Sequence, residues 1–429
     1  MALGEDVRRD RGSRGAGPSP DDRTGTFAAL SDPRYRVLFA AGVLVFVAVQ
    51  SQQIARGQIA YEMTGSARGL GGVFLGFGLP MLLLTPFGGV AADRLPKRTV
   101  ILFAEACLVL SALWVGIADH LDVLEYWMLV GAAAVQGAGF SVFGPARVAM
   151  TAELVPAQLV GNAIVLTQLS LNSTRIVAPA AAGALIGISA IGTSGVYLIT
   201  AALTVASLVL SFWLPRTQPR ADRPKRSVLG EMGDGVRYVW RHPTLRPLMA
   251  VSYVLVMVGF PYMAFLPAMA QDVFDAGVSG YGVMSSVTAF GALGVTIWIA
   301  GRSRPGQAWK VQSAGAAAFS IGLVFLGLAP TFGVAIVALL VVGGAASAFQ
   351  AMNNTLVLTE SELEYHGRVQ SLLMISFSGF GLAALPLGIL ADRIGLRASH
   401  VGMGTICLGA VAVYVLARRR ARDQVQIEL

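Results

Sequence analysis

Residues 88–98 read GGVAADRLPKR, a basic stretch that ends one long apolar run at residues 69–91 and leads into another at residues 99–118. A helix rises about 1.5 Å per residue and needs about 20 apolar residues to cross the hydrocarbon core of a bilayer. Each run is long enough to span a membrane. The stretch between them is therefore predicted to connect two membrane-spanning helices at one membrane surface.

The same pattern extends outward over the whole chain of 429 residues. Hydrophobic residues make up 55% of it and charged residues only 13%, about half the charged fraction of a soluble domain, which is roughly 25%. The fold class is predicted to be an all-α membrane protein with twelve transmembrane helices. Apolar spans are predicted at residues 36–60, 69–91, 99–118, 125–146, 160–187, 192–214, 245–270, 278–300, 309–328, 332–355, 367–391 and 398–417.

The two halves of the chain echo each other. The Pro-x-x-Arg-x-Leu pattern of residues 33–38 recurs at residues 243–248, and Gly161 ahead of the fifth span has a counterpart in Gly367 ahead of the eleventh. Two echoes at nearly equal offset, matched to span order, indicate two related six-helix bundles, one known transporter plan. The predicted domains are a disordered tail (1–31), a first bundle (32–214), a linker (215–244), a second bundle (245–417) and a basic tail (418–429).

The net charge of +8 is distributed unevenly. With the N-terminus placed inside, 27 of the 32 Lys and Arg residues fall on the cytoplasmic side, as the positive-inside rule requires. Both termini are therefore predicted to be cytoplasmic. This accounts for the basic composition without a nucleic-acid partner, and leaves only a weak attraction to anionic lipid.

Several classes of site lack the residues they need. Cys107 and Cys407 both lie inside apolar runs, and the four histidines are far apart, so no metal site is predicted. None of the three lysines lies in a phosphate-binding loop pattern. No convergent nucleophile and base is evident either. We expect neither an enzyme nor a bound cofactor, and any active transport would be driven by an ion gradient.

The stretch at residues 88–98 resembles the signature of the major facilitator superfamily between its second and third helices. The stretches FGPARVAMTAELVP (143–156), GNAIVLTQLSLNSTRIVAP (161–179) and NNTLVLTESELEYHGRVQSL (353–372) resemble the bacterial drug-exporter branch that includes the enterobactin exporter and macrolide efflux proteins. The resemblance implies a bacterial inner-membrane exporter in which two six-helix bundles rock against each other, with protons as the coupling ion.

The resemblance is incomplete. The antiporter motif of the fourth helix places an arginine three residues before a Gln-Gly pair, but Ala133 stands there, ahead of Gln136 and Gly137. The second copy of the loop signature has decayed to AGRSRPGQ, with Gly301 near the place of the aspartate. These departures put the family's usual scheme of proton coupling in doubt.

A substrate cavity is predicted from polar residues within the spans, because amides and charges in a bilayer must face water, a partner or a ligand. In span five the residues Gln168, Asn172 and Arg175 share one helix face. Arg175 could bind an anionic group or lock two helices together. Span one adds Gln50, Gln53 and Arg56, and span seven adds Tyr262 as an aromatic wall.

Proton coupling requires a buried carboxyl group, and the candidates are Glu105 and Glu62. Glu105 could instead belong to a salt-bridge network. A cytoplasmic gate is also predicted, in which ion pairs break and re-form as the bundles rock. The gate and motif residues are Gly88, Gly89, Asp93, Arg94, Lys97, Arg98, Arg147, Glu153, Glu360 and Arg368.

The function predicted from the sequence is proton-coupled export of amphipathic small molecules, either drugs or siderophore-like compounds, by a protein expected to be monomeric. A lipid or lysolipid flippase is an alternative within the transporter class. A transport-inactive sensor is an alternative from another class, although the largest predicted inner loop has only about 30 residues.

Overall fold

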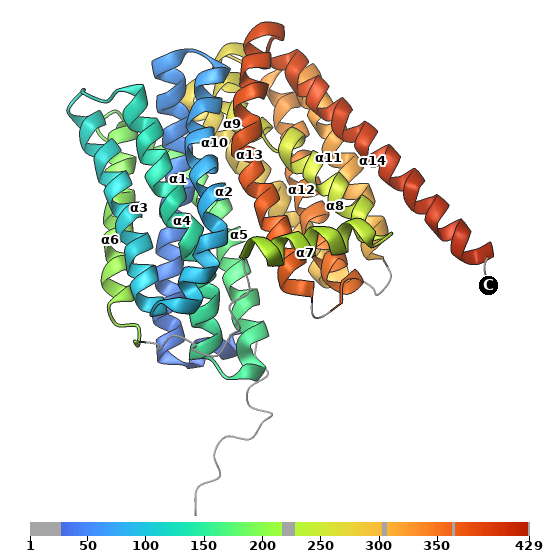
Figure 1. Cartoon of the computed structure of the whole chain (residues 1–429). Coiled ribbons are helices and arrows are strands. Elements are labelled where there is room, and N and C mark those ends of the chain that lie inside the picture. The colour runs from blue at the N-terminus through green and yellow to red at the C-terminus, as the bar shows by residue number, and fades with distance from the viewer. Residues whose placement is uncertain (1–26, 217–227, 303–306, 363–364, 428–429) are drawn as a thin grey trace, which may run out of the picture.

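The computed structural model describes residues 27–216, 228–302, 307–362 and 365–427, and these residues are helical almost throughout (Figure 1). The described part forms two groups of membrane-spanning helices, which we call the N-bundle (α1 to α6) and the C-bundle (α8 to α14). The N-bundle helices are α1 (Pro33–Thr64), α2 (Ala67–Arg94), α3 (Lys97–His120), α4 (Tyr126–Leu154), α5 (Val160–Ile186) and α6 (Gly192–Ser211).

Local capping explains where the first two helices begin and end. Asp32 accepts a hydrogen bond from the backbone N–H of Arg34 at 2.8 Å and caps the start of α1. Gly65, with a φ of 54°, ends that helix in the left-handed conformation that glycine adopts at little cost. Ser66 then caps α2 by accepting a hydrogen bond from the N–H of Gly69 at 3.2 Å. The chain thus reverses direction within two residues.

The first span of the C-bundle is irregular. It comprises α8 (Leu245–Val254), a π-helical turn (Leu255–Gly259), α9 (Tyr262–Ala268) and a second π-helical turn (Met269–Val273). Pro261 and Pro267 each lack the backbone N–H that a continuous helix requires, which accounts for the interruptions. The other spans are α10 (Gly277–Arg302), α11 (Ala308–Leu328), α12 (Phe332–Glu360), α13 (His366–Ile394) and α14 (Leu396–Ile427).

The two bundles repeat one packing order. In the N-bundle α4 packs on α2 and α3, and α3 packs on α6. In the C-bundle α12 packs on α10 and α11, and α11 packs on α14. Among the described residues, ten spans are long and apolar enough to cross a membrane, and α5 and α13 are the two further long helices. The repeated order is what a duplication of six helices produces.

Two segments hold structure that the sequence pattern did not predict. Residues 28–31, placed in the disordered tail, form a 3-10 turn in which the N–H of Ala29 donates to Asn162 Oδ1 at 3.0 Å. The predicted linker contains the helix α7 (Val228–Arg241). Parts of the predicted tails and linker, at residues 1–26, 217–227 and 428–429, lie outside the described residues.

The bundles have two opposite ends, which we call the terminus side and the far side. The terminus side is the end where α1 begins and α14 ends, at the bottom of Figure 1. The far side is the opposite end, which carries the turns between α1 and α2, α3 and α4, and α13 and α14. The bundles meet through two pairs of helices, α2 with α13 and α5 with α10.

Candidate functional site

The two bundles approach most closely near the far side, where glycines allow backbone to meet backbone. A Cβ atom at Gly71 of α2 would lie 2.5 Å from the carbonyl oxygen of Ala384 in α13. In the second pair of helices, a Cβ at Gly183 of α5 would lie 2.8 Å from the Cα of Gly282 in α10. Both distances are too short for any side chain. Tight helix contacts of this kind hold the interface closed in its far-side half.

Two carboxylates of the C-bundle make polar contacts across the same interface, beside a hydrogen bond from Gln271 to Gln58 at 3.1 Å. Asp392, near the end of α13, accepts hydrogen bonds from the backbone N–H groups of Ala67 at 2.8 Å and Arg68 at 3.2 Å, the first residues of α2. It therefore caps a helix of the other bundle. Asp272 accepts a hydrogen bond from the hydroxyl of Tyr61 in α1. Together these contacts form a far-side closure between the bundles.

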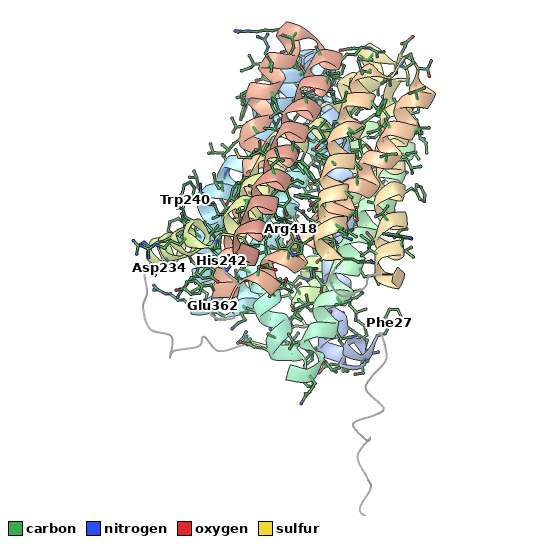
Figure 2. All side chains as sticks on the ribbon, turned by 90° about the vertical axis from the view of Figure 1, so that its right-hand side faces the viewer. Phe27, Asp234, Trp240, His242, Glu362 and Arg418 are labelled. Atoms are coloured by element: carbon green, nitrogen blue, oxygen red, sulfur yellow. The ribbon has the colours of Figure 1, made fainter. Side chains whose placement is uncertain are left out.

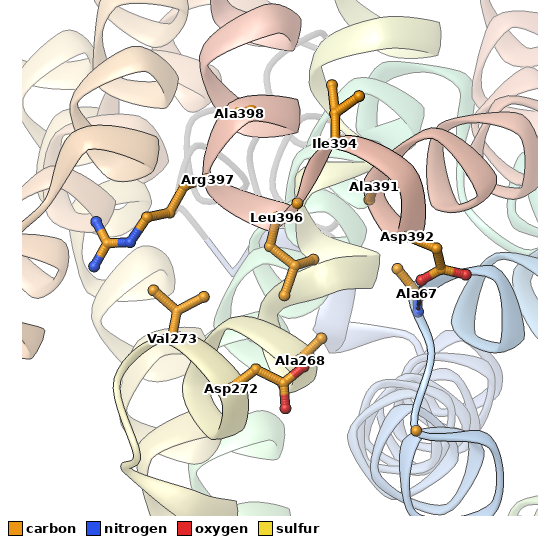
Figure 3. Close-up of a pocket in the computed structure, with 12 residues that line it drawn as sticks. Ala67, Ala268, Asp272, Val273, Ala391, Asp392, Ile394, Leu396, Arg397 and Ala398 are labelled. Atoms are coloured by element: carbon orange, nitrogen blue, oxygen red, sulfur yellow. Dashed lines mark hydrogen bonds between the residues drawn. The ribbon is translucent and has the colours of Figure 1, made fainter.

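A cavity of about 540 Å³ lies beside this closure (Figure 3). Asp272 and Asp392 line it from different elements, and Arg397 points away from both (Figure 3). Arg397 instead donates to the carbonyl oxygen of Ala329 at 2.5 Å and lies over the ring of Phe274 at 5.5 Å. These contacts hold the guanidinium group within the C-bundle, whereas the two carboxylates face the N-bundle.

Arg175 of α5 is placed differently from the other arginines of the spans. Its side chain is exposed, although it lies deep within the protein near the middle of a 27-residue helix. Gly183, eight residues further along the same helix stripe, packs against α10. Arg175 therefore lies on the side of α5 that faces the other bundle. The side chains of Gln168 and Asn172 lie outside the described residues.

The predicted polar stripe of α1 is divided between two environments. Gln50 and Gln53 are half-buried, whereas Arg56 is only 5% exposed. Arg56 donates to Gln136 of α4, which in turn donates to Gln52. The structure thus differs from the prediction at Arg56, because this network holds its guanidinium inside the N-bundle rather than in the cavity.

Tyr262 also differs from its predicted place in the cavity wall. It is 1% exposed and packs edge-on against Phe319, with ring centroids 6.0 Å apart. The break at Pro261 turns this residue into the core of the C-bundle. In this conformation neither Tyr262 nor Arg56 can contact a solute between the bundles.

A charged centre lies in the interior of the N-bundle. Glu105 of α3 is completely buried, and its Oε1 accepts hydrogen bonds from the hydroxyls of Ser207 at 2.6 Å and Ser211 at 3.1 Å. Arg147 of α4 is 4% exposed, lies over the ring of Phe46 at 4.7 Å, and interacts electrostatically with Glu105. We call Glu105 and Arg147 the charged centre.

The charged centre is only partly satisfied by hydrogen bonds. Among the described residues, Glu105 Oε2 and the Nε and Nη1 atoms of Arg147 have no hydrogen-bond partner. Gly42 of α1 makes room for the guanidinium, since a Cβ at that position would lie 2.1 Å from Arg147 Nη2. Buried charges with free hydrogen-bonding atoms are costly, and they are characteristic of functional positions in membrane proteins.

The structure brings together only some of the predicted gate residues. Lys97 Nζ lies 2.6 Å from Glu153 Oε1 at the terminus side. Arg98 lies over the ring of Phe212 at 5.9 Å, while Arg147 belongs to the charged centre instead of a surface gate. Of the remaining predicted residues, Gly88 lies against the backbone of Ser141, Arg94 is exposed, Glu360 is half-buried, and Arg368 lies over the ring of Tyr365 at 4.8 Å.

The other predicted residues are two of the loop motif and the two acids of proton coupling. The surroundings of Gly89 and the side chain of Asp93 lie outside what the structure describes. Glu62 is exposed at the far-side end of α1 and accepts a hydrogen bond from Gln58 at 2.6 Å. Of the two acids predicted for proton coupling, Glu105 alone is buried in the membrane-spanning part of the protein.

The far-side closure was missed by the sequence reasoning. The sequence does contain one indication of this closure. The tripeptide Ala-Asp-Arg at residues 92–94 recurs at residues 391–393. The second copy contains Asp392, which caps α2. No comparable pattern marks Asp272.

Comparison with known proteins identifies relatives along most of the chain. The sequence profile described as Major Facilitator Superfamily matches residues 38–381. Macrolide efflux protein A of Streptococcus pyogenes is 24% identical over 364 residues, which cover 82% of this chain and 88% of that protein. Multidrug efflux pump Tap of Mycolicibacterium fortuitum is 24% identical over 380 residues, covering 85% and 91%.

Solved structures share the fold. A bacterial homologue of the human lysosomal transporter Spinster, in an inward-facing and unoccupied conformation, superposes with a TM-score of 0.72 at 17% sequence identity. The match covers 90% of this chain and 96% of that one. The predicted all-α membrane fold, with twelve transmembrane helices in two six-helix bundles, is confirmed.

Proposed function

This chain belongs to the Major Facilitator Superfamily, and we propose that it exports amphipathic small molecules of the drug or siderophore class from a bacterial cytoplasm by proton-coupled alternating access. As a member of a transporter family it is not an enzyme. Its two relatives named for efflux, of macrolides and of multiple drugs, support the direction of transport and the class of substrate.

In the proposed orientation the terminus side faces the cytoplasm. The positive-inside distribution of Lys and Arg supports it, since 26 of the 32 fall on that side by their place in the sequence once Arg147, which lies in the interior of the N-bundle, is left out of the 27. The protein would then lie in the inner membrane with both termini inside. The far-side closure would face the exterior.

One observation carries the alternating-access part of the proposal. The bundles are closed at the far side, while Arg175, deep in α5 on the surface that faces the other bundle, is exposed. A site open from one side and closed at the other is one of the two states that such a transporter needs. We propose that the bundles, residues 32–214 and 245–417, rock as rigid bodies within a monomer. The gate pair Lys97–Glu153 would hold within the N-bundle during that motion.

The polar groups on the facing surfaces of α1 and α5 would suit amphipathic solutes. Arg175 offers a fixed positive charge that can pair with an anionic or strongly polar group. The half-buried amides Gln50 and Gln53, with Gln168 and Asn172 on the predicted face of α5, would supply neutral hydrogen bonds. Apolar helix surfaces around these few polar groups fit a broad set of substrates, as polyspecific export requires.

The charged centre is the proposed element of proton coupling. Ionised Glu105 can only accept hydrogen bonds and attracts Arg147, whereas protonated Glu105 carries a donor and no charge. Ionised and protonated Glu105 therefore require different contacts from the surrounding helices. These helices are α1, α3, α4 and α6, which meet at this point. Protonation of Glu105 would change how Arg147 is held, and so bias the shape of the N-bundle.

The test uses inside-out membrane vesicles with an imposed proton gradient, acid in the lumen. The lumen is then equivalent to the cell exterior. Wild type is expected to accumulate a radiolabelled macrolide, a cationic dye or a siderophore when the gradient is present. Arg175→Ala should lose accumulation of those compounds that carry an anionic or strongly polar group, because the proposed site loses the fixed charge that pairs with such a group. Arg393→Ala is the matched control, since it removes an exposed arginine at the far side.

Failure of correctly inserted wild-type protein to accumulate any of the three compounds would contradict the export proposal. Equal accumulation by Arg175→Ala and wild type would contradict the assigned site without contradicting export. The two results are therefore distinguishable.

A further inference from the structure

The helix α7 (Val228–Arg241), between the two bundles, has three distinct surfaces. Gly235 and Val239 are buried, Val236 and Trp240 are 50% and 67% exposed, and Asp234, Arg237 and Arg241 are exposed polar residues. With 100° between successive residues, these sets form separate stripes along the helix. The apolar exposed stripe lies between the buried stripe and the charged one.

The buried stripe docks α7 on the start of α13. Gly235 packs closely against Arg368, because a Cβ atom added at Gly235 would lie 3.1 Å from the Cβ of Arg368. Tyr238 stacks on Tyr365 with ring centroids 4.0 Å apart and planes 5° from parallel. The hydroxyl of Tyr238 also accepts a hydrogen bond from the N–H of Glu362 at 3.0 Å. These contacts fix both the position of the helix and its rotation about its own axis.

Because the rotation of α7 about its axis is fixed, the directions in which its two exposed stripes point are fixed as well. Figure 1 shows α7 lying across the other helices near the terminus side, and Figure 2 shows it projecting from the side of the protein. Trp240 lies on the upper side of this projection, toward the membrane-spanning body, and Asp234 lies at its outer edge (Figure 2). Trp240 therefore points toward the level of the bilayer.

A bilayer surface complements this arrangement. Tryptophan and aliphatic side chains partition to the boundary between head groups and acyl chains, and arginines beside them attract anionic head groups. Arg237 and Arg241 lie on the charged stripe, and Arg246 follows the helix, with its guanidinium 4.9 Å from the Trp240 ring. An exposed tryptophan beside three arginines is therefore better suited to the head-group boundary than to water.

We propose that α7 is an interfacial anchor that binds the anionic phospholipids of the leaflet on the terminus side. Val236 and Trp240 enter the head-group boundary, and Arg237 and Arg241 bind lipid phosphates. Because α7 packs on α13 and also lies against α2, the anchored helix holds one helix of each bundle at this surface. These two helices are also the pair that meets in the far-side closure.

The first experiment locates the apolar stripe in lipid. Cys107 and Cys407 are the two native cysteines, so both are replaced by alanine and a nitroxide is attached at Val236→Cys or Asp234→Cys in full-length protein in nanodiscs. We expect the label at residue 236 to collide mainly with oxygen, which concentrates in lipid. The label at residue 234 should collide mainly with a water-soluble nickel chelate. Nickel-dominated collisions at both positions would overturn the proposal.

The second experiment tests the charge of the lipid. Hydrogen exchange of the α7 amides is compared in nanodiscs of phosphatidylcholine and of phosphatidylcholine mixed with phosphatidylglycerol. The anionic lipid should slow exchange by about fivefold for each arginine that contacts a head group. Arg237→Gln with Arg241→Gln should abolish the difference. Lys310→Gln, which removes an exposed charge at the start of α11, should retain it.

Exchange that is equally slow with both lipids would show that the protein alone protects α7, and would overturn the anionic-lipid assignment. Protection that rises with protein concentration at constant lipid would instead assign the surface to a second copy of this chain. Neither readout depends on which compound is exported. Failure of the anchor proposal is therefore separable from failure of the transport proposal.

Discussion

The interiors of the two bundles differ in charge although their helices pack in the same order. Among the described side chains of the N-bundle, four charged ones are buried: Arg56, Lys97, Glu105 and Arg147. Within the described part of residues 245–418, the buried polar side chains are hydroxyls, amides and one histidine. The carboxylates of the C-bundle that contact the other bundle, Asp272 and Asp392, lie at its far-side edge.

The difference is sharpest at positions related by the duplication. At offsets of 206 to 210 residues, Gly42 corresponds to Ser252, Glu105 to Gln312, Arg147 to Asn353, and Ser207 to Tyr414. The hydroxyl of Ser252 donates to Asn353 Oδ1 at 2.8 Å, where the N-bundle places Arg147 against Gly42. The C-bundle thus contains a neutral counterpart of the charged centre.

This comparison separates what packing requires from what function requires. A neutral amide and hydroxyl pair is sufficient to join the corresponding helices in the C-bundle, so packing alone does not need buried charges there. Replacing a buried ion pair by neutral groups is often neutral or stabilising. We therefore propose that the charges retained in the N-bundle serve transport.

The largest expected effect comes from removing one charge of the charged centre. Arg147→Ala leaves Glu105 buried without its cation and should destabilise the protein by about 3–5 kcal/mol. The corresponding change in the C-bundle, Asn353→Ala, removes only the hydrogen bond from Ser252 and should cost about 1–2 kcal/mol. Thermal unfolding in detergent measures both. Equal losses would contradict the difference between the bundles.

A smaller effect is expected from filling the space beside the arginine. Gly42→Ala places a methyl group where the Arg147 guanidinium lies, and overpacking of this kind costs about 1–3 kcal/mol. Ser252→Ala, the corresponding C-bundle change, should cost about 1 kcal/mol, because it removes one neutral hydrogen bond. Adding Arg147→Lys, which keeps a positive charge beside Glu105 on a smaller head group, should restore part of the stability lost in Gly42→Ala. Absence of that rescue would show that the methyl group clashes with something else.

The smallest expected effect concerns the edge charges of the C-bundle. Asp392→Asn weakens the cap on α2 and should shift the balance between closed and open far-side states about fivefold, equivalent to about 1 kcal/mol. Spin labels at Val123→Cys and Pro330→Cys, in the far-side turns of the two bundles, report that balance as a change in distance distribution. Asp275→Asn is the matched control, an exposed aspartate with positive φ that asparagine also tolerates. A shift of equal size in the control would contradict the role of Asp392.

Much of the fold could be predicted from the sequence, because the length and apolar character of a span are local properties. The predicted linker at residues 215–244 and the pattern of residues 33–38 that recurs at residues 243–248 were enough to divide the chain into two sets of spans. The helix α7 was missed because it lies in a segment that is polar on average. Its apolar residues are apparent only as stripes on a helix surface.

The candidate site was less predictable, since the decisive contacts join residues far apart in the chain. Arg56 was predicted to line the cavity, but its partner Gln136 lies 80 residues away and holds it inside the bundle. The partners in the cap of α2, Ala67 and Asp392, are separated by 325 residues. Helical spacing can place residues on one face, but it cannot show which other helix that face meets.

The most direct test of the proposed coupling compares Glu105 with its C-bundle counterpart in proteoliposomes. Transport of a cationic dye or macrolide is measured with and without a proton gradient for wild type, Glu105→Gln and Gln312→Ala. Glu105→Gln should still let the compound equilibrate across the membrane, but the gradient should no longer drive its accumulation. Gln312→Ala should accumulate it as wild type does. Full gradient-driven accumulation by Glu105→Gln would contradict the assignment of coupling to the charged centre.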